Sequence, residues 1–463
     1  MTTQVFVAST AFGLATVVAA LDDGAFAPAD RRILLLSNNA ATPETANRIE
    51  DVAGLRGLFG RFDDVYDYND VIAPQHPSLW RPRAADLPIL QRHFAALWGL
   101  DDDVHLVVES IQVSPAVTLC RIFPDARIDV YADGLMSYGP TRSKLPALVA
   151  SRVERLLHLD LAPGLTPVLL TEFGVPATVI STDAFRKTIA SLDPPPPVIA
   201  GQPPGQVAVL LGQYLAAAGL LTLEEETELH LEMVRGAVAA GFGSLIFKPH
   251  PTAPPMLAEP LVAEAARLGA SLTVYDGPEL VETWFRSESI GCVIGCFSTA
   301  LMTAATCYDL PVARVGTELL LDRLRPFQNS NRIPVTIIHA TLPHVTKLSA
   351  SAGDHRADTR SPDELAWIVR AVSYCMQPQR YPDLRASAEQ LLSERGEEAW
   401  HYFKRRRLTV LDLPGRLPER TPRRLLVPRP VRVVVKRALG PSMSAQVSRI
   451  SQRLIAPGAS RTG

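Results

Sequence analysis

The chain has 463 residues, of which 47% are hydrophobic and 20% are charged. This length exceeds one ordinary core and predicts two domains of roughly 150 to 200 residues each, with a remainder for a tail. The composition excludes a disordered or fibrous chain and a small binding module, and it favours a mixed α/β protein. The net charge of −2 is unevenly divided, because residues 401–463 hold 15 basic and 2 acidic residues. An acidic body of charge −15 therefore carries a tail of charge +13.

The N-terminal stretch 5–21 is apolar and has the composition of a leader peptide or a membrane anchor. No basic residue precedes Arg31, polar residues interrupt the stretch, and it is shorter than the ~20 apolar residues that span a bilayer. We therefore expect a strand at 5–8, a polar loop and a buried helix, with no secretory leader. The odd number of scattered cysteines favours a reducing cytoplasm without disulfides. These cysteines are Cys120, Cys292, Cys296, Cys307 and Cys375.

Short apolar runs bounded by turn residues alternate with helical segments through the first half of the chain. The expected strands cover residues 5–8, 33–36, 65–68, 104–108, 128–131 and 156–159. This alternation predicts βαβ units and a mostly parallel sheet, in a first domain over residues 1–193. A proline-rich segment follows, and we assign residues 194–204 as a semi-rigid linker because consecutive prolines cannot continue a helix or join a central strand.

The same alternation resumes after the linker and predicts a second α/β domain over residues 205–400. Its expected strands cover residues 207–211, 245–247, 272–275 and 292–294, and its expected helices cover 223–240, 256–268 and 299–307. Two such domains place a cleft between the carboxyl ends of two parallel sheets, where ligands of open α/β sheets bind. Residues 401–463 are left as the basic tail.

A first chemical motif, Tyr131-Ala132-Asp133-Gly134, ends one of the expected strands. A carboxylate on such a strand-end turn faces the predicted cleft and is suited to accept a proton from a substrate hydroxyl. An ordinary Asp-Gly turn explains the same pair, so the motif alone leaves both interpretations open.

A second motif, Phe247-Lys248-Pro249-His250-Pro251, also ends a strand. The flanking prolines fix the backbone around His250, whose protonated ring would stabilise a leaving phosphate with added charge from Lys248. The pair His76-Pro77 repeats the dipeptide without a preceding strand, and we interpret it as structural.

A third motif joins Gly291 and Gly295 to Ser298-Thr299 at the start of a helix. The glycines let backbone approach a ligand, and a hydroxyl at the positive helix end predicts an anion site. The alternative is that Ser298 only caps its helix. The triplet 101–103 precedes a strand and is assigned to a solvated turn instead of a metal site, and the chain has neither a Walker A sequence nor a dinucleotide fingerprint.

In this order, the Asp-Gly, Lys-Pro-His-Pro and Phe-Ser-Thr motifs resemble the bacterial polysialyltransferase and sialyltransferase families. The likeness covers most of residues 1–340 and includes Gly212-Gln213, which resembles the loop that opens the nucleotide domain. It implies a GT-B fold, with two Rossmann-like domains, and an inverting, metal-independent transfer of a nonulosonic acid from a CMP-activated donor to a glycan or glycolipid acceptor. No cofactor and no metal are expected.

The resemblance also implies roles for individual residues. Asp133, followed by Gly134, would be the general base on the acceptor hydroxyl. His250, presented by Pro251, would stabilise or protonate the departing phosphate, which Ser298 and Thr299 would bind. The carboxylate that binds the cytidine ribose would be Glu282, although Glu279 is close enough in sequence to take that role.

Ala132 departs from the family pattern, which has an acidic residue at this position. The transferred sugar is therefore not restricted to sialic acid, and Kdn or Kdo is equally admissible. Two alternatives stay open. One is a CDP-polyol phosphotransferase of the teichoic-acid type, whose base is usually an N-terminal-domain histidine. The other is a non-catalytic GT-B-like protein that binds glycans or acts as a scaffold.

The tail interleaves basic and apolar residues between 404 and 437, which suits an anionic membrane surface, where each basic residue contributes about 1 kcal/mol. Phe403 is its last aromatic residue, so base stacking is unsupported and no nucleic acid is expected. We therefore expect a cytoplasmic, peripheral protein on the inner face of the membrane, with a solvated tail as the alternative.

Overall fold

The computed structural model describes residues 1–40, 42–43, 48–52, 54–101, 103–132, 134–193, 195–250, 258–348 and 361–418. The chain divides into a compact unit, Met1–Arg416, and a second unit, Leu417–Gly463. Within the first unit the strands form two parallel sheets, which confirms the predicted α/β class.

The first sheet has seven strands in the order β3-β2-β1-β4-β5-β6-β7. Its strands are β1 (Thr2–Ala8), β2 (Arg31–Leu36), β3 (Asp64–Asp67), β4 (Asp103–Glu109), β5 (Arg127–Ala132), β6 (Val153–Leu159) and β7 (Ala177–Ile180). Neighbouring side chains on β1 enter different cores, because Phe6 packs toward α1 (Ala11–Asp22), whereas Val5 and Val7 pack toward α3 (Leu87–Trp98). Burial on both faces explains why these strands are continuous apolar runs in the sequence.

The second sheet has five strands in the order β10-β9-β8-β11-β12. Its strands are β8 (Val207–Leu211), β9 (Ser244–Lys248), β10 (Ser271–Val274), β11 (Ile290–Gly295) and β12 (Val312–Arg314). Because β8 lies between β9 and β11, the segments that follow these three strands emerge side by side at one edge of the sheet.

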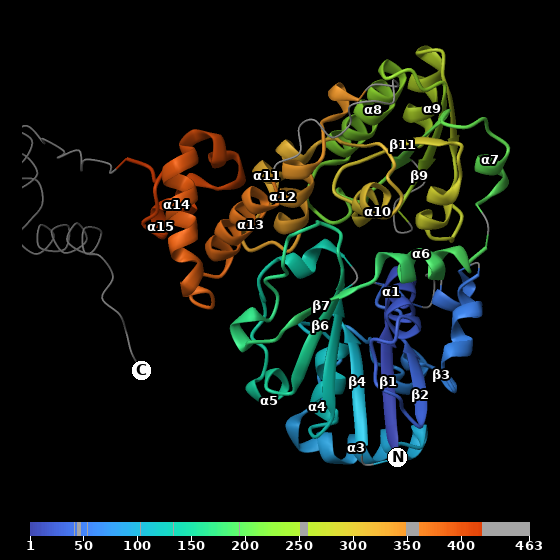
Figure 1. Cartoon of the computed structure of the whole chain (residues 1–463), viewed down its shortest axis with the longest axis vertical. Helices are drawn as coiled ribbons and strands as arrows, with labels where there is room; N and C mark the ends of the chain where they lie inside the picture. The colour runs from blue at the N-terminus through green and yellow to red at the C-terminus, as the bar shows by residue number, and fades with distance from the viewer. Residues whose placement is uncertain are drawn as a thin grey trace, which may run out of the picture. The chain divides into compact units, whose positions relative to one another are not determined.

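Helices cover both sheets, and α6 (Thr182–Ala190) packs on α1 of the first half and on α10 (Thr299–Cys307) of the second (Figure 1). The other helices of the first half are α2 (Tyr68–Ile72), α4 (Ala116–Ile122) and α5 (Ala147–Ala150). Those that follow are α7 (Pro197–Ala200), α8 (Leu223–Ala239), α9 (Ala258–Arg267), α11 (Thr317–Arg323), α12 (Arg332–Thr341), α13 (Pro362–Met376), α14 (Arg385–Arg395) and α15 (Arg405–Val410).

The chain returns to the first half after α13. The hydroxyl of Tyr381, which is 2% exposed, donates to Glu172 Oε2 at 2.6 Å and accepts from Thr141 N–H at 2.8 Å. Arg380 Nη1 donates to the carbonyls of Thr141 and Ser143, each at 2.7 Å. A buried polar network therefore joins the C-terminal helices to the first half.

The predicted elements are found within a few residues of their expected bounds, with local differences. Residue 68 was expected to end a strand, but Tyr68 begins α2, because the Asp67 carboxylate caps the following backbone at Asn69 N–H. Strands β7 and β12 and the helices from α11 onward were not predicted. All five cysteines are buried free thiols, and no helix among the described residues is long and apolar enough to cross a membrane.

Candidate active site

Three loops meet at the carboxyl edge of the second sheet, where β8, β9 and β11 end. The loop after β8 bonds to the end of β9, since Gly212 N–H donates to the Lys248 carbonyl at 2.9 Å. The same loop reaches the segment after β11, where Phe297 N–H donates to Gln213 Oε1 at 3.3 Å. The structure thus brings the predicted residues Gly212, Gln213 and Lys248 together with the approach to Ser298.

Gly212 is required by close approach at this edge. A Cβ atom at this position would lie 2.7 Å from Phe247 Cζ and 3.1 Å from Pro249 Cα. Real Cβ atoms do not approach other atoms to 2.7 Å, so a larger residue would displace one of the two loops. Glycine therefore lets the β8 loop lie directly on the Lys-Pro-His segment.

A buried carboxylate from α8 organises the rest of the β8 loop. Glu226 is 1% exposed, and its two oxygens accept from Leu215 N–H at 2.7 Å and from Ala216 N–H at 2.9 Å. Charged acceptors make such bonds stronger than neutral ones. The backbone beside Tyr214 is consequently fixed, and the Tyr214 ring centroid lies 4.2 Å from that of His250.

His250 is half-buried directly after β9. Burial lowers the pKa of its imidazole to about 4, because removal from water disfavours the charged form. The ring is therefore neutral near pH 7 in the ligand-free protein. A bound phosphate would restore the charged form by supplying the compensating negative charge.

Lys248 points its ammonium toward the loop after β10. Its Nζ donates to the Gly277 carbonyl at 2.7 Å and lies 4.8 Å from the centroid of the Trp284 ring. Burial lowers the pKa of Lys248, while nearby carboxylates, led by Glu279, oppose that shift. Lys248 thus lies at the carboxyl edge of the second sheet, as predicted, but its ammonium is already hydrogen-bonded and faces an aromatic ring.

The two candidate ribose carboxylates differ in exposure. Glu282 is 3% exposed and accepts from Thr303 Oγ1 of α10 at 3.1 Å, and burial raises its pKa. Glu279 is half-buried, and its Oε1 accepts from Trp284 Nε1 at 3.2 Å. Glu279 is therefore the more exposed of the two carboxylates, whereas Glu282 ties its own 3₁₀ turn to α10.

The N-terminus of α10 meets the Asp-Gly turn of the first half. Ser298 is the N-cap, and its Oγ accepts from Ala300 N–H at 3.3 Å. A Cβ atom on Gly134, two residues after the end of β5, would lie 2.7 Å from Thr299 Oγ1. Motifs separated by about a third of the chain are thus in contact at the meeting of the two halves.

Two predicted site residues, Asp133 and Pro251, lie outside the described residues. Ala132, immediately before Asp133, is the last residue of β5 and is paired in register with His158 of β6. His158 is 4% exposed, and burial lowers its pKa. A histidine therefore does lie beside the Asp-Gly motif, which strand spacing alone did not reveal.

A second acidic group lies at the carboxyl edge of the first sheet and was missed in the sequence. Glu109 ends β4, is 6% exposed, and its Oε2 accepts from Ser9 N–H at 2.7 Å and from Ser9 Oγ at 2.8 Å. Its Oε1 accepts from Thr10 Oγ1, the N-cap residue of α1, at 3.3 Å. The position of Glu109 at the end of an apolar strand was the available signal, but nothing in the sequence paired it with Ser9.

Among the described residues, one group of side chains has the spacing of metal ligands, and it lies away from the strand ends. It consists of His105, Asp129 and Glu154, near the starts of β4, β5 and β6. Arg155 Nη2 already donates to Asp129 Oδ2 at 2.7 Å, so a guanidinium occupies part of this position. The group therefore has no connection with the site built by the three motifs.

Two parallel sheets, joined where the Asp-Gly turn meets a helix N-terminus, define a protein with two Rossmann-like halves. The chain belongs to the alpha-2,8-polysialyltransferase family (POLYST), whose sequence profile matches residues 4–317. This match confirms the resemblance indicated by the motifs, and it makes the chain a glycosyltransferase by family. No curated protein sequence matches the chain.

Solved structures with similar folds are distant in sequence. UGT73P12 of Glycyrrhiza uralensis, complexed with glycyrrhetinic acid 3-O-monoglucuronide, is 12% identical over 86% of this chain and 99% of its own, with a TM-score of 0.45. A putative UDP-N-acetylglucosamine 2-epimerase from Listeria monocytogenes is 13% identical over 82% and 97%, with a TM-score of 0.43. MurG of Acinetobacter baumannii is 11% identical over 84% and 95%, with a TM-score of 0.39.

Proposed function

We propose that this glycosyltransferase moves a nonulosonic or ulosonic acid, of the sialic acid, Kdn or Kdo type, from a CMP-activated donor to a glycan or glycolipid acceptor. The reaction inverts the anomeric centre and uses neither a metal nor a cofactor. The observation that carries the proposal is the contact between Gly134 and Thr299, which sets the Asp-Gly turn against the start of α10.

The proposed reaction needs a base on the Asp-Gly side of the contact between Gly134 and Thr299, and a phosphate-binding group on the α10 side. The acceptor oxygen forms a bond to the anomeric carbon, and its proton passes to the Asp133 carboxylate. The bond between that carbon and the CMP phosphate oxygen breaks, and the electron pair leaves with the phosphate. Ser298 and Thr299 hold the phosphate with their hydroxyls and the adjoining backbone N–H groups at the start of a nine-residue helix.

His250 supplies positive charge or a proton to the departing phosphate. Its ring lies beside Tyr214, in the group formed by the ends of β8 and β9. The donor brings its own carboxylate and phosphate, so catalysis needs a base on one side and a cation or aligned dipoles on the other. The half-buried Glu279, in place of the buried Glu282, is the carboxylate that we assign to the cytidine ribose.

Calorimetry with CMP, UDP, GDP and CDP-glycerol, with and without EDTA, tests the proposal. We expect CMP to bind in EDTA and to lose affinity in the double variant Ser298→Ala/Thr299→Ala. The control is Ser191→Ala, which removes a hydroxyl at the C-cap of α6. Binding of UDP and not CMP would contradict the CMP-activated donor. Binding of CMP only in the presence of a metal would contradict the metal-independent reaction.

A CDP-polyol phosphotransferase is the second candidate, and one observation favours it. His158 lies in register with Ala132, so the first half does hold a histidine beside the motif. Its ring is buried edge-on against Tyr138, which weakens it as a base that meets substrate. CMP release from CDP-glycerol, lost in His158→Gln, would favour this candidate, and CMP release from a CMP-sugar favours the first. Nucleotide binding without any turnover would instead favour the non-catalytic glycan-binding alternative, which Ala132 keeps open.

We further propose a peripheral position on the inner face of the membrane, with attachment by residues 417–437. The beginning of the predicted basic segment is occupied within the fold, since Lys404 Nζ bonds Asp322 Oδ1 at 2.6 Å and Arg407 Nε bonds the Cys375 carbonyl at 2.7 Å. Arg405 lies 4.3 Å from the ring centroid of Trp400. These three cations are thus held by contacts within the fold, and residues 419–437 lie outside the described part of the chain.

A further inference from the structure

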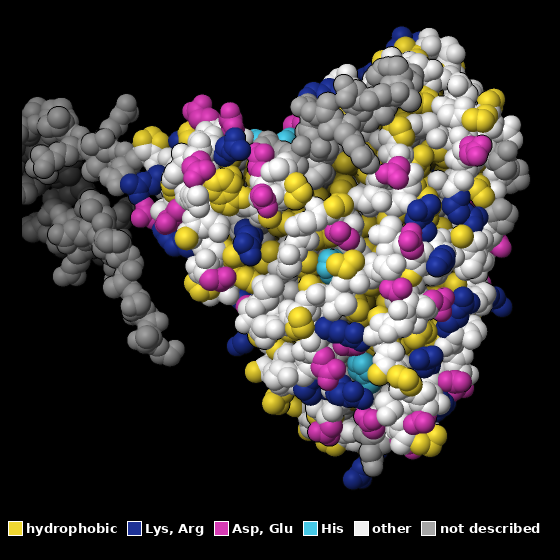
Figure 2. Space-filling view, viewed as in Figure 1, with side chains coloured by type: hydrophobic (Ala, Val, Ile, Leu, Met, Phe, Trp, Pro, Cys, Tyr) yellow, Lys and Arg dark blue, Asp and Glu magenta, His cyan; other side chains and the backbone are white. Residues whose placement is uncertain are grey.

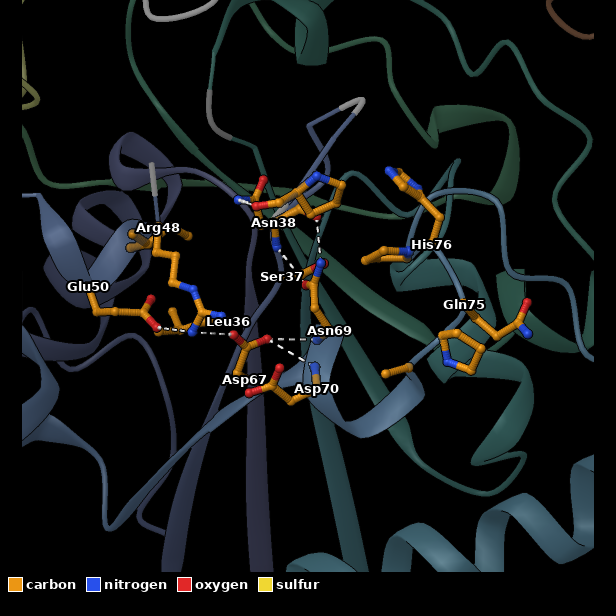
Figure 3. A pocket seen from close by; sticks show the side chains of 15 residues that line it. Leu36, Ser37, Asn38, Arg48, Glu50, Asp67, Asn69, Asp70, Gln75 and His76 are labelled. Carbon is orange, nitrogen blue, oxygen red and sulfur yellow. Dashed lines mark hydrogen bonds and ion pairs between the residues drawn. The ribbon is translucent and has the colours of Figure 1, made fainter. Parts of the chain in front are cut away.

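A cavity of about 300 Å³ opens at the carboxyl ends of β2 and β3 (Figure 3). None of its lining residues belongs to the Asp-Gly turn or to α10. Its lining comes from the end of β2, the segment 48–50, α2 and the loop 73–77. Open α/β sheets bind ligands at this edge, and the volume falls within the usual range for small-molecule pockets. Neither the donor nor the reacting groups proposed above use this cavity.

Hydrogen bonds between its own residues hold the wall of the cavity in place. Asn38 N–H donates to Asn69 Oδ1 at 2.9 Å, and Asn69 Nδ2 donates back to the Asn38 carbonyl at 2.9 Å. His76 Nε2 bonds the Ala40 carbonyl at 2.8 Å, and its Nδ1 bonds Ser78 Oγ at 2.9 Å. The pair His76-Pro77, which we interpreted as structural, thus forms part of this wall and holds it in place.

The charges in the cavity are mostly negative. Its charged lining residues are one cation, Arg48, and three carboxylates, Glu50, Asp67 and Asp70. Arg48 Nη1 lies 3.3 Å from Asp67 Oδ2 and 3.7 Å from Glu50 Oε1, so its charge is already balanced. The described lining therefore leaves no cation to neutralise a bound anion, which would be repelled by the surplus carboxylate.

Two polar side chains of the lining remain available to a ligand. Asp70 and Gln75 are exposed, and neither side chain forms a hydrogen bond or an ion pair with any described residue. A carboxylate offers acceptors and a primary amide offers both donors and acceptors, which together match the hydroxyl groups of a sugar. An apolar ligand would leave these groups unpaired.

From these observations, we propose that the cavity binds a neutral sugar unit of the acceptor, one that carries hydroxyls and no carboxylate or phosphate. The inference rests on the proposed transfer function and deepens it by naming the acceptor class. Strands β1 and β4 separate β2 from β5, and three spacings of ~4.8 Å place the cavity roughly 14 Å from the Asp-Gly turn. The cavity therefore holds a distal sugar unit, while the reacting hydroxyl lies at the turn.

The test is direct binding to the full chain in the presence of CMP, measured by ligand-observed NMR and calorimetry. The probes are neutral trisaccharides ending in galactose, glucose or N-acetylglucosamine, with galactosyl-lactose and sialyl-lactose as a matched neutral and acidic pair. We expect at least one neutral trisaccharide to bind, and sialyl-lactose to bind no better than galactosyl-lactose. Asp70→Ala should weaken the neutral ligand roughly tenfold, as expected when a hydrogen bond to a charged acceptor is lost.

Asp70→Lys should weaken the neutral ligand similarly and shift the preference toward sialyl-lactose. Asp125→Lys is the matched control, because it makes the same charge change at an exposed position before β5. The inference is overturned if no neutral trisaccharide binds, if sialyl-lactose binds the wild type more tightly, or if both Asp70 variants bind as the control does. Normal CMP binding in those cases separates failure of this inference from failure of the proposed function.

Discussion

Under the proposed function, the half-buried imidazole of His250 should make donor binding depend on pH. Burial lowers its pKa to about 4, and a phosphate bound beside it would raise that pKa, so binding would take up a proton at pH values between the two pKa values. CMP affinity should therefore rise as pH falls from about 8 to about 6, with uptake of at most one proton. Calorimetry in buffers of different ionisation enthalpy measures that uptake.

The control for this prediction is another histidine of the chain. His250→Gln should bind CMP more weakly and without proton uptake, whereas His93→Gln, an exposed change on α3, should behave as the wild type. Proton uptake that persists unchanged in His250→Gln would exclude His250 as the group that responds to the phosphate.

The contact between Gly134 and Thr299 predicts a specific coupling. Gly134→Ala places a methyl group 2.7 Å from Thr299 Oγ1, and such overpacking costs about 1–3 kcal/mol. In a Thr299→Ala background the hydroxyl is gone, so the same change should cost about 0.5 kcal/mol or less. Urea unfolding of the four proteins measures the difference, and equal costs in both backgrounds would show that the two residues are not in contact.

The positions of most candidate site residues could be predicted from the sequence, whereas the exposure of their side chains could not. The strand-end positions of His250, Ser298 and Gly212 follow from apolar runs in the sequence, and their grouping follows from parallel strands. The choice between Glu279 and Glu282 could not be made from spacing, because it depends on which carboxylate packs against α10. Likewise, Glu226 lies within a helical pattern, and its bonds to the β8 loop depend on tertiary packing.

At the scale of elements, α8 and the β8 loop act as one unit through Glu226. Glu226→Ala leaves two backbone N–H groups without their acceptor, and each such loss costs about 1–3 kcal/mol. We expect lower stability and weaker CMP binding, with a smaller effect in Glu226→Gln, which keeps one acceptor. Glu228→Ala, on an exposed position of the same helix, is the matched control. Unchanged nucleotide affinity in Glu226→Ala would show that the loop does not support the site.

The continuously buried strands were predicted, as were the short and more exposed β3 and β10, but β7 and β12 were not. The strands β1, β4, β5 and β8 are buried nearly throughout and are apolar runs in the sequence. By contrast, β7 is an edge strand with one buried residue of four, and β12 has three residues. These two strands are defined by their hydrogen bonds to a neighbouring strand, and such pairing produces no periodic hydrophobic pattern in the sequence.

On the scale of the whole molecule, the basic charge after residue 416 predicts binding to anionic membranes. Residues 417–463 contain ten basic residues and one acidic residue, whereas acidic and basic side chains are interspersed on the face of the body drawn in Figure 2. The wild type should sediment with vesicles containing about 30% anionic lipid and be released by high salt. Removal of residues 417–463 should abolish this binding.

The boundary of that deletion matters, because the residues before it belong to the fold. Leu408 and Leu413 are 0% and 1% exposed, so removal from residue 404 would expose a core as well as remove charge. Binding that persists in the 417–463 deletion, or that does not respond to salt, would contradict a membrane role for the tail. CMP binding should be unchanged by the deletion.

The return of the chain at Tyr381 has a consequence for any attempt to separate the halves. The proline-rich segment is the natural place to cut, but the C-terminal helices also bind the first half, since the Tyr381 hydroxyl is buried against Glu172 and Thr141. Expressed alone, a fragment ending near residue 193 would lose the Tyr381 hydroxyl from Glu172 and Thr141 and would expose the surface on which the C-terminal helices pack. The first half is therefore expected to be more soluble when it is co-expressed with the second half as a separate polypeptide, and co-purification of the two polypeptides would measure how strongly the C-terminal helices hold it.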